Sequence, residues 1–165
     1  MILLDTNVLS EALKPAPSEA VLRWLAAQEP AEVFISTITQ AEMLYGIELL
    51  PGGRRKTRLA TVVAQLFDVE FQGRTLVFDE ESARAFARIV AGRDASGWPI
   101  SQFDAMIAAI ARARGAAVAT RNVEDFRDCG VRVVDPWRGV RKGDRPLCPR
   151  CGGGGCLGGC GVGTE

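Results

Sequence analysis

Short apolar runs alternate with stretches of helical periodicity along most of the chain. The runs are residues 2–4, 33–35, 76–78, 117–119 and 131–134. Their length and composition are typical of buried strands. Apolar residues at spacings of three, four and seven predict amphipathic helices around residues 43–50, 59–67 and 103–110. Such alternation favours an α/β fold with a parallel sheet covered by helices on both faces.

The composition changes after residue 137. Residues 1–136 hold 15 basic and 18 acidic residues, whereas residues 137–165 hold five basic and two acidic residues. The same tail holds 10 of the 18 glycines and four of the five cysteines. Such a segment has too little apolar surface to offset its chain entropy. We therefore expect one domain at residues 1–137 and a basic, then Gly/Cys-rich and flexible tail at residues 138–165.

The chain contains no histidine. This excludes every mechanism that uses imidazole as base, acid or ligand, including Ser-His-Asp catalysis. No stretch approaches the roughly 20 apolar residues of a membrane span. Asp5 interrupts the apolar N-terminal stretch, which also lacks the cationic leader of a signal peptide. We expect a cytoplasmic protein without membrane contact, whose chemistry depends on carboxylates.

Three carboxylates follow apolar runs at positions that a parallel sheet brings to one edge. Asp5 ends the first run, Glu42 comes shortly after the second, and Asp104 begins a predicted helix. Asn122 and Asp125 follow the run at residues 117–119. Sites in open parallel sheets form outside the carboxyl ends of the strands. We therefore expect these side chains to gather at that edge.

Each of the three acids also has a purely structural interpretation. Thr39-x-x-Glu42 has the pattern of a capping box, and Ser101-x-x-Asp104 has a shorter version of it. Asp5 has the alternative of an Asx-type turn or helix cap.

Several acids at one edge repel one another unless a cation lies among them. Ligand sets made only of oxygen suit Mg²⁺ or Mn²⁺, and Mg²⁺ usually keeps several waters. The chemistry that follows is metal-assisted attack of water on a phosphodiester.

Four motifs carry a resemblance to a known family. They are MILLDTNVLSE, IxxITxAE, FDAMIAA and ATRNxxDF. In this order and spacing they resemble PIN-domain ribonucleases of the VapC/FitB type, the toxins of bacterial toxin–antitoxin pairs, over residues 1–137. The resemblance implies a three-layer α/β/α fold, Mg²⁺- or Mn²⁺-dependent endoribonuclease activity and homodimers. It also implies neutralisation by a cognate antitoxin.

The resemblance assigns roles to residues at matching positions. Asp5, Glu42 and Asp104 match the acidic triad of the family. Many members have an acid where this chain has Asn122, whereas Asp125 matches the acid of the TRNxxDF variant. We therefore expect the metal at the triad together with Asn122 or Asp125.

Three further residues have supporting roles. Thr6 and Thr120 resemble the family's hydroxyl positions, with simple turn hydroxyls as the alternative. Arg121 lies beside the fourth acid position, where it can contact a phosphate. The dense basic segment at residues 54–58 either binds RNA or an acidic partner, or is a solvated helix end.

Two other functions remain open. A PIN-like module that binds in a toxin–antitoxin complex without turnover would use the acids only to hold a metal or cap helices. A carboxylate-metal phosphatase would use Asp5 as the nucleophile, but the second acid of a D-x-D motif is replaced by Asn7. No glycine-rich phosphate loop is present.

Four cysteines lie in the tail: Cys148, Cys151, Cys156 and Cys160. Four thiolates are the right number for structural Zn²⁺, but only four residues separate the second and third cysteines. A tail without metal is the alternative that the glycine content favours. The fifth cysteine, Cys129, is expected to be a small buried residue.

Overall fold

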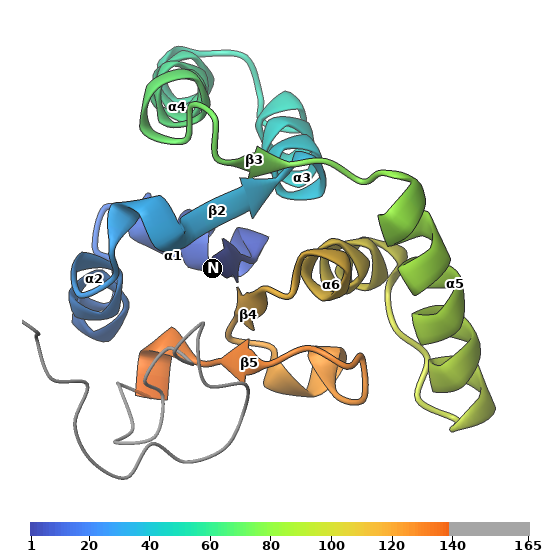
Figure 1. Ribbon diagram of the computed structural model, residues 1–165. Helices are drawn as coiled ribbons and strands as arrows, with labels where there is room; N and C mark the ends of the chain where they lie inside the picture. The colour runs from blue at the N-terminus through green and yellow to red at the C-terminus, as the bar shows by residue number, and fades with distance from the viewer. Residues whose placement is uncertain (139–165) are drawn as a thin grey trace, which may run out of the picture.

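A five-stranded parallel sheet lies between two layers of helices in the computed structural model, which describes residues 1–138 (Figure 1). The strand order is β3-β2-β1-β4-β5, and all four neighbouring pairs are parallel. The strands are β1 (Ile2–Leu4), β2 (Val33–Ser36), β3 (Thr75–Leu76), β4 (Ala117–Ala119) and β5 (Val133–Val134). The expected three-layer α/β/α fold is confirmed, although β3 and β5 are shorter than their apolar runs.

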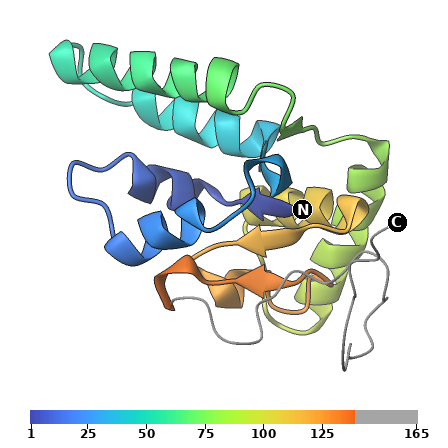
Figure 2. The ribbon, with the colours of Figure 1, turned by 60° about the vertical axis from the view of Figure 1, so that its left-hand side comes forward.

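Six α-helices connect these strands within residues 1–138. They are α1 (Thr6–Ala12), α2 (Glu19–Ala26), α3 (Thr37–Glu48), α4 (Arg54–Gln65), α5 (Glu80–Ala95) and α6 (Gln102–Arg114). A π-helical turn, η2 (Leu66–Glu70), continues α4. Three short 3-10 helices are η1 (Pro30–Glu32), η3 (Val123–Phe126) and η4 (Pro136–Arg138). Figure 2 shows α3 and α4 packed lengthwise against each other, on the opposite side of the sheet from α5.

Successive side chains of the central strand point to opposite faces of the sheet, so the core consists of two layers. Ile2 and Leu4 of β1 belong to the layer that contains Trp24 of α2. Leu3 points the other way, into the layer that contains Ile107 of α6. This is the period-two pattern of a strand that is buried on both faces. The apolar run at the start of the chain therefore fixes β1 as the centre of the sheet.

The predicted apolar stripes are only partly buried. Met43 and Ile47 of α3 lie in the core as expected. Leu44, Val62 and Phe103 are among the apolar positions whose spacing predicted these helices, but they are exposed. Each helix presents a narrow face to the sheet, and these three positions lie at the flanks of that face.

Part of the sequence-based prediction cannot be compared with the structure. The four tail cysteines lie outside the described residues, so the zinc site and the domain boundary remain predictions. Cys129 is buried, as expected. No helix within residues 1–138 has the length and hydrophobicity to cross a membrane.

Candidate active site

Asp5 lies at the carboxyl end of the central strand and is only 4% exposed. Its backbone N–H donates to the carbonyl of Ala119, which extends the pairing of β1 with β4. Its Oδ1 atom accepts a hydrogen bond of 2.7 Å from the backbone N–H of Thr6 and so caps α1. The cap that we considered as an alternative role is therefore present, but it uses only one of the two carboxylate oxygens.

The second oxygen of Asp5 belongs to a buried hydrogen-bond network. The Thr120 hydroxyl donates to Oδ2 at 2.7 Å, and the Asn7 amide donates to the same atom at 2.6 Å. Asn7 Nδ2 also donates to Thr120 Oγ1 at 2.9 Å. Asn7 is not among the site residues that the sequence motifs predict. Its signal was position alone, two residues after an acid that ends a strand.

Glu42 projects from α3 toward the start of α1. Its Oε2 atom accepts a hydrogen bond of 2.6 Å from the Thr6 hydroxyl. The predicted capping box is wrong, because Ser36 caps α3 by accepting from the backbone N–H of Thr39 at 3.0 Å. The helix begins directly at the end of β2, and Thr39 is buried within its first turn. Glu42 therefore has no capping role.

Asp104 combines a structural role with membership of the group of acids. Ser101 caps α6 by accepting from the backbone N–H of Asp104 at 3.1 Å, as the sequence predicted. The Ser101 hydroxyl also lies 2.6 Å from Asp104 Oδ2. Ser101 and Asp104 are three residues apart, at the two ends of the first turn of α6. Their two hydrogen bonds therefore fix this turn and orient the Asp104 carboxylate at the same time.

Four acids affect one another electrostatically, and we call them the carboxylate cluster: Asp5, Glu42, Asp104 and Asp125. The pKa of Asp5 is raised to about 6, mainly because the carboxyl group is buried. The hydrogen bonds from Thr120 and Thr6 lower this pKa, and the charges of Asp104 and Glu42 raise it further. Burial, and then the charge of Asp104, raises the pKa of Glu42.

Asp104 shows the same behaviour on the other side of the cluster. Burial raises the pKa of its carboxyl group, the Ser101 hydrogen bond opposes this, and the charge of Asp125 adds to the rise. None of the four carboxylates forms an ion pair with a Lys or Arg of residues 1–138. The cluster is therefore a concentration of negative charge without a protein cation to balance it.

The donor set fits a hard divalent cation that keeps much of its water. All the side chains of the cluster offer oxygen, which Mg²⁺ and Mn²⁺ prefer. In the described part of the chain, no three His, Cys, Asp or Glu side chains are close enough to enclose one ion. Mg²⁺ commonly binds through one or two carboxylates and several waters, so it does not need three side chains that enclose it.

The two candidates for the fourth position differ in placement. Asp125 lies in η3, partly buried, and its charge acts on Asp104. Asn122 is exposed, and its backbone N–H donates to Thr120 Oγ1 at 3.0 Å. The charge of Asp125 acts on Asp104, whereas the contacts of Asn122 involve its backbone.

Arg121 lies at the rim of the hydrogen-bond network. Its backbone N–H donates to Asn7 Oδ1 at 3.2 Å, and its guanidinium lies 5.6 Å from the centre of the Trp137 ring. A cation–π contact of this kind holds an exposed guanidinium over the aromatic face. The side chain is thus tethered to the site through both its backbone and its charged end.

The fold and the cluster together define a three-layer α/β domain with acids at the carboxyl edge of a parallel sheet. Residues 2–130 match the profile of the family described as PIN domain. The chain belongs to the PIN-domain family.

Relatives of known name cover the same part of the chain. "VapC ribonuclease Y4jK" of Sinorhizobium fredii is 39% identical over 83% of this chain and 98% of its own length. "Toxin FitB" of Neisseria gonorrhoeae is 41% identical over 83% of this chain and 99% of its own. A solved structure of FitAB bound to a DNA fragment contains a chain that is 40% identical, with a TM-score of 0.81. That match covers 86% of this chain and 99% of the other.

Proposed function

We propose that this protein is a metal-dependent endoribonuclease that acts as the toxin of a toxin–antitoxin pair. The observation that carries the proposal is the carboxylate cluster, whose acids repel one another and have no cationic partner within residues 1–138. It lies on a PIN domain about as similar to a named ribonuclease as to a named toxin. The names of these relatives support the substrate class.

Asp5, Glu42 and Asp104 would hold Mg²⁺ or Mn²⁺, one or two of them directly and the others through its waters. Asp125 would be the fourth acid, with Asn122 as its alternative. A divalent ion bound there would supply positive charge for the phosphodiester and lower the pKa of an attacking water. The neutral carbonyl of Asn122 adds no charge, and the effect of Asp125 on Asp104 favours the acid.

The remaining residues of the site act on the acids or on the substrate. Thr120 and Asn7 donate to one oxygen of Asp5, which favours its ionised form and fixes the carboxylate plane. Thr6 fixes Glu42 by the same means. Arg121 is placed to contact a phosphate of the substrate, because its guanidinium is exposed at the rim.

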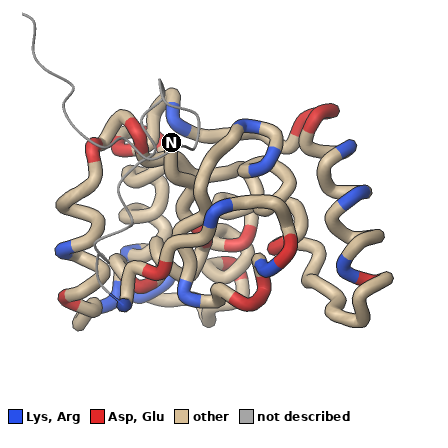
Figure 3. The backbone as a smooth tube through the Cα atoms, turned by 60° about the horizontal axis from the view of Figure 1, so that its bottom comes forward, with Lys and Arg blue, Asp and Glu red and all other residues tan. Residues whose placement is uncertain are grey.

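The charge distribution limits how RNA is bound. Residues 1–136 carry three more acidic than basic residues, and Figure 3 shows both signs interspersed over the elements of the described chain. In the basic segment at residues 54–58, Lys56 pairs with Glu48 at 2.8 Å. Such a surface does not favour strong non-specific binding, so the proposed enzyme selects its RNA by local contacts.

The partners follow from the relatives. FitB-type chains occur in a FitAB complex on DNA, so we propose that a cognate antitoxin binds this chain. A homodimer, and a larger assembly with the antitoxin, remain part of the proposal.

Calorimetric titration with Mn²⁺ tests the site first. We expect the wild type to bind Mn²⁺ and the double variant Asp5→Asn/Asp104→Asn to lose measurable binding. Asp68→Asn is the matched control, because Asp68 is an exposed acid in η2. RNA cleavage should disappear in the same double variant and persist in the control. Equal Mn²⁺ binding by the double variant would remove the basis of the metal mechanism.

The same proteins separate the competing functions. Mn²⁺ binding without cleavage of any RNA favours a binding module that has no turnover. Hydrolysis of a chromogenic phosphate monoester, lost in Asp5→Asn, favours a phosphatase. The proposed enzyme should cleave RNA and leave the monoester intact.

A further inference from the structure

Trp98 combines an exposed side chain with a fixed backbone. It lies in the connection between α5 and α6, and 68% of the residue is exposed. Its backbone N–H donates to the carbonyl of Arg93 at 3.0 Å, and its carbonyl accepts from Arg93 Nε at 2.6 Å. Gly97, with a φ of 75°, provides the left-handed turn that this closure needs. These hydrogen bonds fix the backbone of Trp98, while its indole side chain is exposed to solvent.

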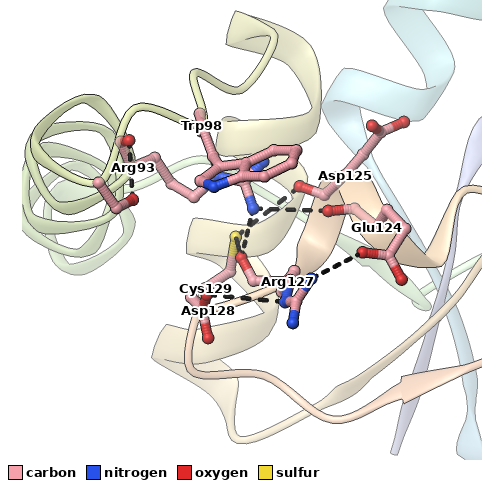
Figure 4. Close-up of polar contacts among 8 residues, drawn as sticks. Arg93, Trp98, Glu124, Asp125, Arg127, Asp128 and Cys129 are labelled. Atoms are coloured by element: carbon pink, nitrogen blue, oxygen red, sulfur yellow. Dashed lines mark hydrogen bonds and ion pairs between the residues drawn. The ribbon is translucent and has the colours of Figure 1, made fainter.

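Arg93 connects the Trp98 backbone to the candidate active site. The residue is only 5% exposed, and its Nη1 atom donates to the carbonyls of Arg127 at 2.6 Å and of Glu124 at 3.4 Å (Figure 4). Glu124 belongs to η3, the short helix that also carries Asp125. One buried guanidinium therefore fastens the Trp98 backbone to the element that bears the fourth acid.

A second exposed aromatic residue lies beside the third acid. Phe103 is 49% exposed and directly precedes Asp104 in the first turn of α6. Trp98 and Phe103 therefore both present apolar ring surface to water. Neither ring position is needed for the caps or hydrogen bonds that hold the acids, because those use Ser101 and the backbone.

The charge of the domain determines which ligand such rings suit. Residues 1–136 carry three more acidic than basic residues, so we expect part of the attraction for a nucleic acid to come from uncharged groups. Nucleobases have uncharged π-faces that stack on aromatic side chains, and only unpaired bases expose those faces. We infer that Trp98 stacks on an unpaired base of the RNA substrate, and Phe103 offers a second exposed ring beside Asp104. This inference rests on the proposed ribonuclease function.

Binding of a labelled oligonucleotide measures the effect. The probe is a fluorescein-labelled single-stranded RNA of about 12 nucleotides. Ca²⁺ replaces Mg²⁺ in the buffer, and a gel checks that the probe stays intact. We expect Trp98→Ala to raise Kd about ten-fold and Trp98→Phe to restore most of the affinity. Val69→Ala, which shortens an apolar side chain that is 61% exposed in η2, should leave Kd unchanged.

Two further readouts distinguish stacking from a general effect on the fold. The same RNA annealed to its complement should bind wild type and Trp98→Ala equally, because its bases are paired. RNA should quench tryptophan emission more in the wild type than in Trp98→Phe. Trp24 is buried, and the half-buried Trp137 beneath Arg121 is present in both proteins, so the difference between them reports Trp98. The melting temperature should stay the same in all three variants, because the exposed indole supports little of the core.

The outcomes separate this inference from the function beneath it. If the wild type binds no RNA of either kind, the inference fails, whereas the proposed function is decided by Mn²⁺ binding and RNA cleavage in the wild type and the double variant. If the wild type binds single strands and Trp98→Ala binds them equally well, only the inference is overturned. Loss of self-association in Trp98→Ala with unchanged RNA affinity would overturn it too, and would assign Trp98 to a contact between copies of the chain.

Discussion

A single residue, Asp5, joins the structural and chemical parts of the molecule. One oxygen caps α1, and the other receives two side-chain hydrogen bonds. Burial nevertheless outweighs these donors and raises the pKa of the carboxyl group to about 6. The protein thus tolerates an unfavourable charge at the end of its central strand. Such tolerance is typical of functional sites, where stability is commonly sacrificed.

The stability of the metal-free protein should therefore fall as the pH rises. Between about pH 4 and pH 6 the folded chain keeps a proton on Asp5 that the unfolded chain has released, so this contribution is complete at low pH and lost as the pH passes 6. The pKa values of Glu42 and Asp104 are also raised, which gives the same sign. Urea unfolding in EDTA at several pH values measures the slope.

The variant Asp5→Asn isolates the contribution of this residue. At pH 7 the loss of the buried charge favours the folded variant, but the amide nitrogen replaces one acceptor oxygen of the hydrogen-bond network. We therefore expect the free energy of unfolding to rise by less than about 3 kcal/mol. Its stability should also depend less on pH. An equally steep pH dependence in Asp5→Asn would show that Asp5 is ionised at little cost. Asp68→Asn should reproduce the wild-type curve.

The sequence indicated the acids but not all of their partners. Asp5, Glu42 and Asp104 stand out because each follows a strand or begins a helix at a position that topology brings together. Arg93 gave no such signal, and Asn7 gave only its position two residues after Asp5. Their roles depend on which carbonyls and hydroxyls lie near them in space, and a linear pattern does not contain that information.

At the scale of elements, the connection between η3 and the end of α5 holds the site together. Arg93 lies in the last turn of α5 and donates to three backbone carbonyls in two separate segments. Buried carbonyls without donors cost free energy, so the guanidinium supports both segments at once. The positions of Asp125 and of the loop before α6 depend on this one side chain.

Arg93→Met should loosen these segments before it affects the sheet. We expect a loss of about 2–3 kcal/mol in the free energy of unfolding, because the carbonyls lose charged hydrogen bonds. Hydrogen exchange should quicken at residues 122–129 and 96–101 while β1 and β4 stay protected. Arg88→Met on the same helix is the control, since Arg88 is exposed. Uniformly faster exchange throughout the domain would contradict this local role.

The boundaries of elements were harder to predict than their existence. The segment ISTITQAE contains two possible caps at the same spacing, Ser36-x-x-Thr39 and Thr39-x-x-Glu42. The structure uses the first, because β2 runs directly into α3 and its last residue supplies the cap. A sequence pattern cannot choose between the two without knowing where the strand stops pairing. The π-helical turn after α4 had no signal at all.

At the scale of the whole molecule, the described residues form both apolar layers of the core. One apolar layer joins the sheet to α1–α4, and the other joins it to α5 and α6. The alternation of runs and helices was enough to predict the layers. It did not predict that β1 and β4, more than 110 residues apart in sequence, lie side by side, because strand order depends on long-range pairing.

A chain that ends at residue 138 should consequently fold as the full chain does. Its sheet, both apolar layers and the carboxylate cluster are complete without the later residues. We expect the melting temperature to change by no more than about 2 °C, which corresponds to less than about 1 kcal/mol for a domain of this size. A larger fall, measured by calorimetry on both chains, would show that the tail packs on the domain.

The proton that Asp5 retains near pH 6 affects how the proposed enzyme binds its metal ion. A cation that enters the cluster must displace this proton, so loading acidifies an unbuffered solution and tightens as the surroundings become more alkaline. Protons and metal ions then compete for one carboxylate at the end of the central strand.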